Sequence, residues 1–211
     1  MAYDIPYIPA TSFVNLTEAD LIGRGNKRAC YKHPDDSRLC IKVARNAGAW
    51  HENVIEWIYI NHLKQQGVPL DHLIDCYDWT NTNFGPGLVF ERVMDEDGTP
   101  SPTLAEAIRT RRVEISDISP MLVYLKEWAI GYSVVVAELN SVNLLLQKKN
   151  GGYNLMMVDG VGGRDRITWK FYMYRKSKLF SRMKTRKQIK RLEPVLFDEV
   201  SNICAYDRYD I

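Results

Sequence analysis

Residues 138–146 and 157–162 constrain the fold of this chain more than any other segment, because a turn-forming sequence joins two apolar runs. The connecting residues 148–152 read Lys-Lys-Asn-Gly-Gly, which is typical of a hairpin turn between two strands. Asn143 stands just before the first run and Asp159 just after the second, so strand pairing would bring them to neighbouring strand ends. Two oxygen ligands held in this way suit Mg²⁺, which keeps the rest of its coordination shell for water and phosphate. The sequence therefore predicts a hairpin that presents a magnesium site.

The positive charge of the chain is concentrated in residues 164–191, which contain twelve of the 28 Lys and Arg residues and one of the 26 Asp and Glu residues. Aromatic and apolar residues recur there every three or four positions, which predicts one or two amphipathic helices over 167–191. Three interpretations stay open: a solvated basic face, a docking surface for anionic membrane lipid or lipopolysaccharide, and a nucleic-acid-binding surface. No RNA- or DNA-binding signature accompanies the segment, so nucleic acid is the least favoured partner.

Within this basic segment we expect aromatic side chains to pack inward and basic side chains to point outward. The aromatic residues expected inside are Trp169, Phe171, Tyr172 and Phe180. The basic residues expected outside are Arg175, Lys178, Arg182 and Lys184.

The length and composition favour one domain, or two small lobes that share a cleft. Of the 211 residues 45% are hydrophobic, which is enough for an ordinary globular core. The four cysteines include no Cys-x-x-Cys pair and the histidines have no ligand spacing, so neither a zinc site nor a disulfide framework is predicted. No signal peptide is visible, and the most apolar stretch, residues 121–137, is interrupted by Lys126 and Glu127. We therefore predict a cytoplasmic protein, and the basic segment leaves open a peripheral position at the inner membrane.

A glycine-containing turn follows a short strand that begins at Leu21. Gly23 and Gly25 let main-chain N–H groups approach an anion closely. A plain hairpin turn explains the same residues, since a single Gly-x-Gly is common. Phosphate binding and a plain turn both stay open. The basic residues that add positive charge here are Arg24, Lys27 and Arg28.

A charged residue interrupts the next predicted strand, residues 39–43. Lys42 would be costly to bury without a carboxylate partner, although strand alternation also allows it to face solvent. The following helix, predicted over residues 51–66 from its apolar spacing, carries Glu52 and Glu56 one turn apart. A carboxylate of this helix is therefore the candidate partner of a buried Lys42.

The remaining chain predicts four more elements before the hairpin. A helix is expected to begin after the capping residue Thr103. The acidic stretch after Val93 reads as a linker. The predicted elements are strands over 73–79 and 87–93 around a loop at 80–86, a short helix to about Arg111, and a long helix over 121–131 introduced by residues 117–120.

Together these residues resemble the YrbL family of bacterial proteins, named as members of the PhoP regulatory network and similar to small, divergent protein kinases. The resemblance covers roughly residues 20–190, and its most specific part is the His-Pro-x-Asp turn before Cys-Ile-Lys. It implies an α+β, protein-kinase-like, two-lobed fold. Residues 1–94 would form a small antiparallel-sheet N-lobe, and residues 95–211 a shortened, mostly helical C-lobe. The residues that carry the resemblance are Gly23, Gly25, Cys30, Tyr31, His33, Pro34, Cys40, Ile41, Lys42, Glu56, 139–145, Asp159 and Gly160.

The resemblance also implies that the chain binds ATP with Mg²⁺. Lys42 would hold the α- and β-phosphates, and Glu56 would fix its ammonium group. Asn143 and Asp159 would bind the metal. Lys42, Asp159 and Glu138 would be the catalytic residues, with Glu138 as the base.

The rest of the implied nucleotide site comes from the first half of the chain. The turn containing Gly23 and Gly25 would cover the nucleotide. The strand that ends in the acidic linker would be the hinge between the lobes. There, main-chain groups from Glu91 to Val93 would contact the adenine.

The kinase signatures are incomplete. Glu138 stands where kinases carry the Asp of His-Arg-Asp, Val-Ala precedes it, and Asn140 replaces the usual lysine. A glutamate can accept a hydroxyl proton, but its extra methylene moves the carboxylate by about 1 Å, and such a misplacement can cost roughly a hundredfold in rate. Gly160 follows Asp159 in place of the usual Phe, and no Ala-Pro-Glu segment follows. A full peptide-substrate platform is therefore not expected.

The sequence leaves three functions open. The first is an ATP- and Mg²⁺-dependent phosphotransferase with an unknown hydroxyl acceptor (sugar, lipid-linked or protein). It is slightly favoured because Lys42, Glu56, Asn143 and Asp159 occur in order at suitable spacings. The second is a catalytically impaired pseudokinase that binds nucleotide or a partner in a regulatory role. The third is a peripheral membrane or nucleic-acid-binding protein that acts through residues 164–191.

Overall fold

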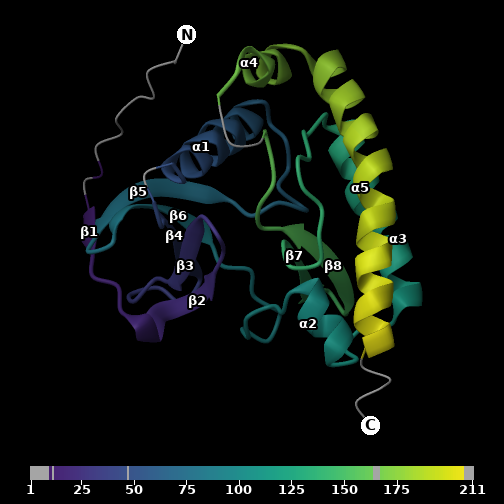
Figure 1. Cartoon of the computed structure of the whole chain (residues 1–211), viewed down its shortest axis with the longest axis horizontal. Helices are drawn as coiled ribbons and strands as arrows, with labels where there is room; N and C mark the ends of the chain where they lie inside the picture. The colour runs from purple at the N-terminus through teal and green to yellow at the C-terminus, as the bar shows by residue number, and fades with distance from the viewer. Residues whose placement is uncertain (1–9, 11, 47, 164–166, 207–211) are drawn as a thin grey trace.

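The computed structural model describes residue 10 and residues 12–46, 48–163 and 167–206. Residues 1–12 contain Pro6 and Pro9, which predict an extended segment, and they lie almost entirely outside the described residues. Strands of a large sheet gather on one side of the molecule and most helices on the other, with helix α1 beside the sheet (Figure 1). The architecture is mixed α+β, as the sequence predicts.

A six-stranded sheet contains all the strands of the first half of the chain, in the order β1-β5-β6-β4-β3-β2. A one-turn 3₁₀ helix, Glu18–Asp20, connects the first two strands. β1 pairs with β5 in parallel, whereas the other neighbours pair antiparallel. The prediction of antiparallel pairing is therefore wrong for β1. This edge strand has three residues and is too short to show in the sequence pattern. The strands are β1 (Ser12–Val14), β2 (Leu21–Arg24), β3 (Arg28–Lys32), β4 (Leu39–Ala44), β5 (Cys76–Thr82) and β6 (Gly85–Glu91).

The turn between β5 and β6 is tighter than predicted. The loop expected over residues 80–86 consists largely of strand, and only two residues separate Thr82 from Gly85. The Thr82 hydroxyl donates a hydrogen bond to the Gly85 carbonyl (2.6 Å) and accepts one from the Phe84 N–H (3.1 Å). The Thr82 side chain thus closes the turn. Because the turn is short, the strands continue through residues whose polar composition is typical of a loop.

Helix α1 (Trp50–Gln65) agrees with the predicted helix to within one residue at each end. Its inner face is buried against the sheet and carries Val54, Ile55 and Tyr59. The helix ends where Gly67 adopts a positive φ of 69°, and the Val68 N–H bonds to the Leu63 carbonyl. A glycine in this position is the usual helix terminator because it has no Cβ to strain.

The predicted hairpin is confirmed as β7 (Leu144–Lys149) and β8 (Gly152–Met157). Asn150 and Gly151 both have positive φ, 54° and 72°, as a two-residue type I′ turn requires. The end of β8 is tied to the segment after α1, because the Ile74 N–H donates to the Met157 carbonyl at 3.2 Å. The hairpin is thus fixed to the first half of the chain.

Four helices complete the structure, and two differ from their predicted bounds. α3 begins before Pro120, which lies inside the helix although it was expected to precede it. α5 continues past the predicted end of the basic helices at residue 191. The Thr103 hydroxyl caps α2 by accepting a hydrogen bond from the Glu106 N–H at 3.1 Å. The helices are α2 (Leu104–Arg109), α3 (Ile115–Gly131), α4 (Trp169–Lys176) and α5 (Lys178–Tyr206).

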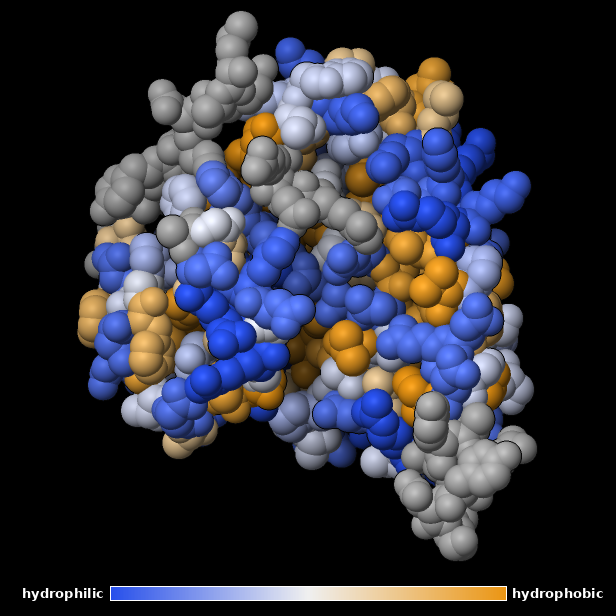
Figure 2. Space-filling view, viewed as in Figure 1, coloured by the Kyte–Doolittle hydropathy of each residue, from blue (hydrophilic) through white to orange (hydrophobic). Residues whose placement is uncertain are grey.

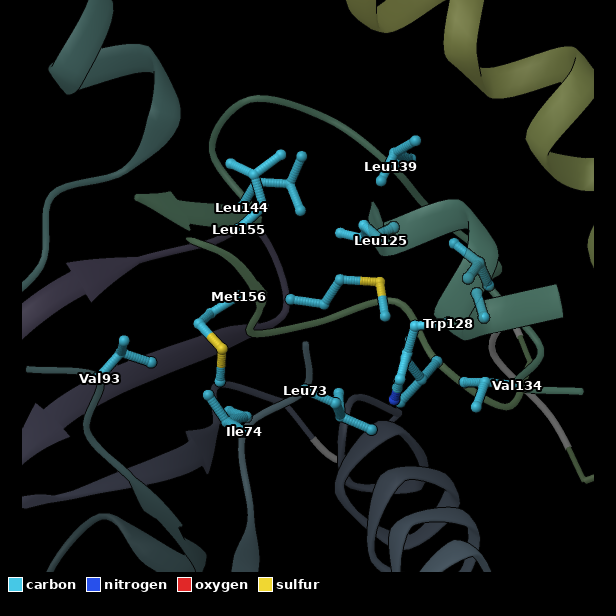
Figure 3. Close-up of a cluster of buried hydrophobic side chains, with 14 of the residues drawn as sticks. Leu73, Ile74, Val93, Leu125, Trp128, Val134, Leu139, Leu144, Leu155 and Met156 are labelled. Carbon is cyan, nitrogen blue, oxygen red and sulfur yellow. The ribbon is translucent and has the colours of Figure 1, made fainter. Parts of the chain in front are cut away.

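One hydrophobic core joins the sheet to the helices. Figure 3 shows part of it, where side chains that follow α1 and β6 lie near others from α3 and the hairpin. A smaller cluster covers the opposite face of the sheet. The division into lobes at residues 94 and 95 stays a prediction. The labelled core residues are Leu73, Ile74, Val93, Leu125, Trp128, Val134, Leu139, Leu144, Leu155 and Met156.

Two smaller observations bear on the class of protein. Among the described helices, none is long and apolar enough to cross a membrane. The four cysteines are free thiols.

Candidate functional site

Lys42 faces the interior from β4, between the sheet and α1. Its ammonium nitrogen lies 3.2 Å from Glu56 Oε2 and donates a hydrogen bond to the Val158 carbonyl. It also lies 4.2 Å from the centre of the Phe90 ring, a distance suited to a cation–π contact. Of the two arrangements that the sequence allows, an outward lysine and a buried ion pair, the structure contains the ion pair.

The sequence analysis names Arg28 only as a positive charge beside the glycine turn, and it did not predict that Arg28 would pair with Glu56 and Asp159. Its buried guanidinium lies 2.8 Å from Glu56 Oε2 and 2.5 Å from Asp159 Oδ2. It also donates to Asn53 Oδ1 at 3.0 Å, and Asn53 in turn donates to the Lys42 carbonyl at 2.8 Å. Arg28 therefore links β3, α1 and the segment after β8.

One sequence signal could have drawn attention to Arg28, and the strand register then shows which way it faces. It stands three residues after Gly25, where the kinase pattern G-x-G-x-x-G-x-V has its third glycine. In the observed register Cys30 pairs with Lys42, and residues two apart on a strand share a face. Arg28 and Cys30 must then lie on the same inner face as Lys42, although an arginine beside a turn reads as an exposed residue.

Buried charges compensate one another at this site. Burial raises the pKa of the Glu56 carboxyl, although Arg28 and Lys42 oppose that shift. Burial also acts to raise the pKa of the Asp159 carboxyl, but Lys42 and Arg28 outweigh it and hold that pKa well below its usual range. Asp159 is the most accessible of the four, with 37% of its side chain exposed. Two cations and two carboxylates therefore offset one another here. At the edge of this cluster Glu52 lies 3.4 Å from Arg28 Nε and 2.7 Å from Lys27 Nζ.

The loop after β8 requires glycine at two positions. Gly160 has a φ of 80°, and a Cβ there would lie 2.7 Å from the Cβ of Glu138. Gly162 has a φ of 79°, and a Cβ there would lie 2.6 Å from the Tyr59 ring. The Gly160 carbonyl accepts hydrogen bonds from the N–H groups of Ala137 (2.7 Å) and Glu138 (3.2 Å). These close approaches fix the backbone of Asp159 against the segment that carries Glu138.

The structure also brings Asn143 close to this loop. Its carbonyl accepts a hydrogen bond from the Val158 N–H at 3.0 Å, and its Nδ2 donates to Glu138 Oε2 at 3.4 Å. Within the described residues, no group of three His, Cys, Asp or Glu side chains could hold a metal. Mg²⁺ needs only a few protein oxygens, because water and phosphate complete its shell. The amide of Asn143 and the carboxylates of Glu138 and Asp159 are therefore donors of the type that fits Mg²⁺.

A cavity of about 180 Å³ lies at the junction of these elements. Hydrophilic residues gather in the middle of the face shown in Figure 2, between the sheet and the helices. The carboxylates of the cavity come from α1, from the segment before Asn143 and from the loop after β8. The residues that line it include Lys27, Glu52, Glu56, Glu138, Asp159 and Gly160.

The predicted glycine turn is only partly a turn, because Gly23 belongs to β2, and neither Gly23 nor Gly25 is among the residues that line this cavity. Gly25 donates its N–H to the Arg28 carbonyl at 2.8 Å, and its own carbonyl accepts from the Arg45 guanidinium at 2.8 Å. Among described residues, Lys27 reaches the cavity from the same turn, where it pairs with Glu52 at 2.7 Å, whereas Gly23 and Gly25 do not. Nucleotide covering by the two glycines stays a prediction.

The predicted hinge is partly occupied by internal hydrogen bonds. The Glu91 N–H donates to the Asp75 carbonyl at 2.9 Å, and the Val93 carbonyl accepts from the Ser101 N–H at 3.1 Å. The N–H of Arg92 donates to the Arg38 carbonyl at 2.8 Å. An adenine could use these groups only by displacing their partners, and a role for Glu91 and Val93 stays a prediction.

Helix α5 holds the segment between Glu138 and Asn143. Ser141 is fully buried, and its N–H and hydroxyl both donate to the Glu199 carboxylate, at 3.1 and 2.6 Å. The sequence analysis did not identify Glu199, which stands 58 positions after Ser141 in the chain. A residue far along the chain thus positions the candidate site.

The basic segment differs from expectation in four side chains, one of which is Lys184, expected outside but half-buried. Trp169, expected inside, is 60% exposed, because Phe171 rather than Trp169 packs against Tyr59. Arg182, expected outside, donates to the carbonyls of residues 130 and 131 at the end of α3. Arg175 is half-buried over the Phe171 ring. Residues 164–166, the beginning of the segment, lie outside the described residues.

Comparison with known proteins identifies the family. The family model described as "PhoP regulatory network protein YrbL" matches residues 14–195. Two similar proteins, from Escherichia coli (strain K12) and Shigella flexneri, carry the description "Uncharacterized protein YrbL". Each is 31% identical over 144 residues, which cover 64% of this chain and 66% of the relative, just under two thirds of its length. Because the family model spans most of the chain, the chain belongs to the YrbL family of PhoP regulatory network proteins.

Proposed function

We propose that this chain is an ATP- and Mg²⁺-dependent phosphotransferase of protein-kinase-like fold, with lobes formed by residues 1–94 and 95–211. The observation that carries the proposal is the Lys42–Glu56 pair at 3.2 Å, held next to Asp159 by Arg28. A strand lysine paired with a helix glutamate, beside an aspartate that follows a hairpin, is the arrangement kinases use to hold phosphates and metal. The acceptor would be a hydroxyl group of a sugar, a lipid-linked molecule or a protein.

Each residue would contribute a defined interaction. Lys42 would hold the α- and β-phosphates, while Asn143 and Asp159 would hold Mg²⁺. The bound metal would neutralise charge that develops on the transferred phosphoryl group. Glu138, which lines the cavity, would accept the proton of the acceptor hydroxyl. Arg28 would have to release Asp159 before that carboxylate could bind a metal, and its guanidinium would then be free to contact phosphate.

A catalytically impaired pseudokinase is the second candidate, and one observation favours it. The Arg28 guanidinium already neutralises Asp159 at 2.5 Å, as a divalent cation would. A site of this kind could bind a nucleotide or a partner without turnover. Such a regulatory role would agree with the family description, which names a regulatory network.

Thermal stabilisation by nucleotide tests the binding step shared by both candidates. At 100 times its Kd, MgADP should add about 2.7 kcal/mol of stability, which raises the Tm of a chain of this size by about 5–10 °C. Lys42→Met and Asp159→Asn should each remove most of that shift, because the first loses the phosphate contact and the second weakens the metal site. The measurement is differential scanning fluorimetry with MgADP and MgATP.

Exposed Lys149 provides the matched control, since Lys149→Met makes the same substitution away from the cavity. The Tm shift of this variant should equal that of the wild type. If millimolar MgATP and MgADP do not stabilise the wild type, the phosphotransferase is wrong, and so is a pseudokinase that binds nucleotide.

A further inference from the structure

The outer face of α4 and of the first turns of α5, called here the α4–α5 surface, presents apolar side chains to solvent. Leu179 is 69% exposed, Met183 61% and Trp169 60%. Leu179 and Met183 lie one helical turn apart, as do Trp169 and Met173, so each pair shares a helix face. Orange and blue atoms adjoin each other in the upper right of Figure 2, where α4 and α5 meet in Figure 1.

These side chains are exposed although the helices are well anchored. On the inner side, Phe171 is buried and its ring centre lies 6.2 Å from that of Tyr59 on α1. Tyr174 and Phe180 stack across the junction of the helices at 5.5 Å. The Ser181 hydroxyl donates to the Tyr174 carbonyl at 2.5 Å and fixes the angle between the helices. The inner positions are therefore filled, and the outer apolar residues have no place in the core.

Basic residues surround the apolar ones. Residues 167–191 contain ten Lys and Arg and no acidic residue. Arg182 is used inside the protein to cap the end of α3, and Arg175 lies over Phe171. The exposed basic residues of the surface are Lys170, Lys176, Lys178, Arg186, Lys187 and Lys190.

We propose that the α4–α5 surface binds the anionic surface of a phospholipid bilayer. Its cationic residues would attract the headgroups, and Trp169, Leu179 and Met183 would enter the boundary between headgroups and acyl chains. Protruding aliphatic side chains on a basic helix fit a lipid interface better than nucleic acid, which is held mainly by polar contacts to phosphates and base edges. This surface does not depend on nucleotide binding, because none of its residues lines the cavity.

Vesicle co-sedimentation tests the proposal. The full chain should bind vesicles of phosphatidylglycerol and phosphatidylethanolamine, should not bind phosphatidylcholine vesicles, and should dissociate as the salt concentration rises. Each basic residue near an anionic surface contributes about fivefold to partitioning. Charge reversal at Arg186, Lys187 and Lys190 should therefore weaken binding at least about a hundredfold. Reversal of the exposed Arg109, Arg111 and Lys149 changes the net charge equally and should leave binding within a few-fold.

Two further variants separate insertion from simple charge attraction. Trp169 is the exposed member of the five tryptophans, so insertion should shift the tryptophan emission to the blue. Trp169→Phe should remove the shift while sedimentation persists. Leu179→Ser should weaken binding about tenfold, because the variant can no longer bury one large apolar side chain in the bilayer interface.

Several outcomes would overturn the proposal. Equal binding to neutral and anionic vesicles, or equal loss in the two charge-reversal sets, would show that the α4–α5 surface is not the contact. Binding without an emission shift would show that the α4–α5 surface is a solvated basic face that attracts polyanions in general. Tighter binding to an RNA or DNA oligomer than to anionic vesicles would assign the surface to nucleic acid.

Discussion

Replacing Arg28 with glutamine is expected to lower the free energy of unfolding by about 3–5 kcal/mol, the usual cost of removing one partner from a buried ion network. The guanidinium bonds to Glu56 and Asp159 and is itself buried. Without it, Glu56 keeps only Lys42 as a cationic partner, in a position where burial already raises its pKa. Urea denaturation monitored by circular dichroism measures the change.

Arg24→Gln is the matched control for Arg28. Arg24 is the last residue of β2, four residues before Arg28, and its ion pair with Glu18 is exposed, so its loss should cost no more than about 1 kcal/mol. A second replacement, Glu56→Gln, should recover part of the loss in the Arg28→Gln protein, because the amide removes the uncompensated charge. If Arg28→Gln costs as little as Arg24→Gln, the ion network does not contribute to stability as the geometry implies.

Glu138→Gln should lower ATP turnover by roughly 10²–10⁴, the usual contribution of a general base. The carboxylate lines the cavity, close to Asn143 and to the loop that carries Asp159. Glutamine keeps the shape and a hydrogen-bonding group but cannot accept the proton. Nucleotide affinity, measured by the MgADP thermal shift, should therefore stay near the wild-type value while turnover falls.

Glu127→Gln serves as the control, because this carboxylate is exposed on α3. Its turnover should match that of the wild type. Equal residual activity in the Glu138→Gln and wild-type proteins would show that Glu138 is not catalytic. A wild type that binds MgADP but does not turn over ATP or any hydroxyl acceptor would favour the pseudokinase.

The parts of the fold that could be predicted depend on interactions between residues close in the chain. The Asn150-Gly151 turn specifies its hairpin through two positive φ angles, so β7 and β8 were predictable from a few residues. Helix α1 was predictable from its apolar spacing. Lys42 was identified as a candidate because a charge inside an apolar strand needs a partner.

The features that were missed depend on contacts between distant residues. Arg28 meets Asp159 131 positions later in the chain, and only the strand register shows that it faces inward. Trp169 and Phe171 were both expected inside, but residues two apart do not share a helix face, and Phe171 occupies the inner position. The polar residues of the β5–β6 turn resemble a loop, although the Thr82 side chain lets the strands continue through them.

The bond between Ser141 and Glu199 has a consequence for the order in which the protein folds during translation. All strands of the six-stranded sheet are complete at residue 91, whereas the carboxylate that holds Ser141 is made more than a hundred residues later. At ordinary rates of synthesis the nascent sheet would wait roughly 5–20 s for this contact. During that interval α1 can already cover the inner face of the sheet, but the hydrophobic core still lacks Leu192, Leu196 and Val200 of α5. The cavity can reach its final shape only after Glu199 has left the exit tunnel, so a stalled chain would carry Lys42, Glu56 and Asp159 without an ordered site.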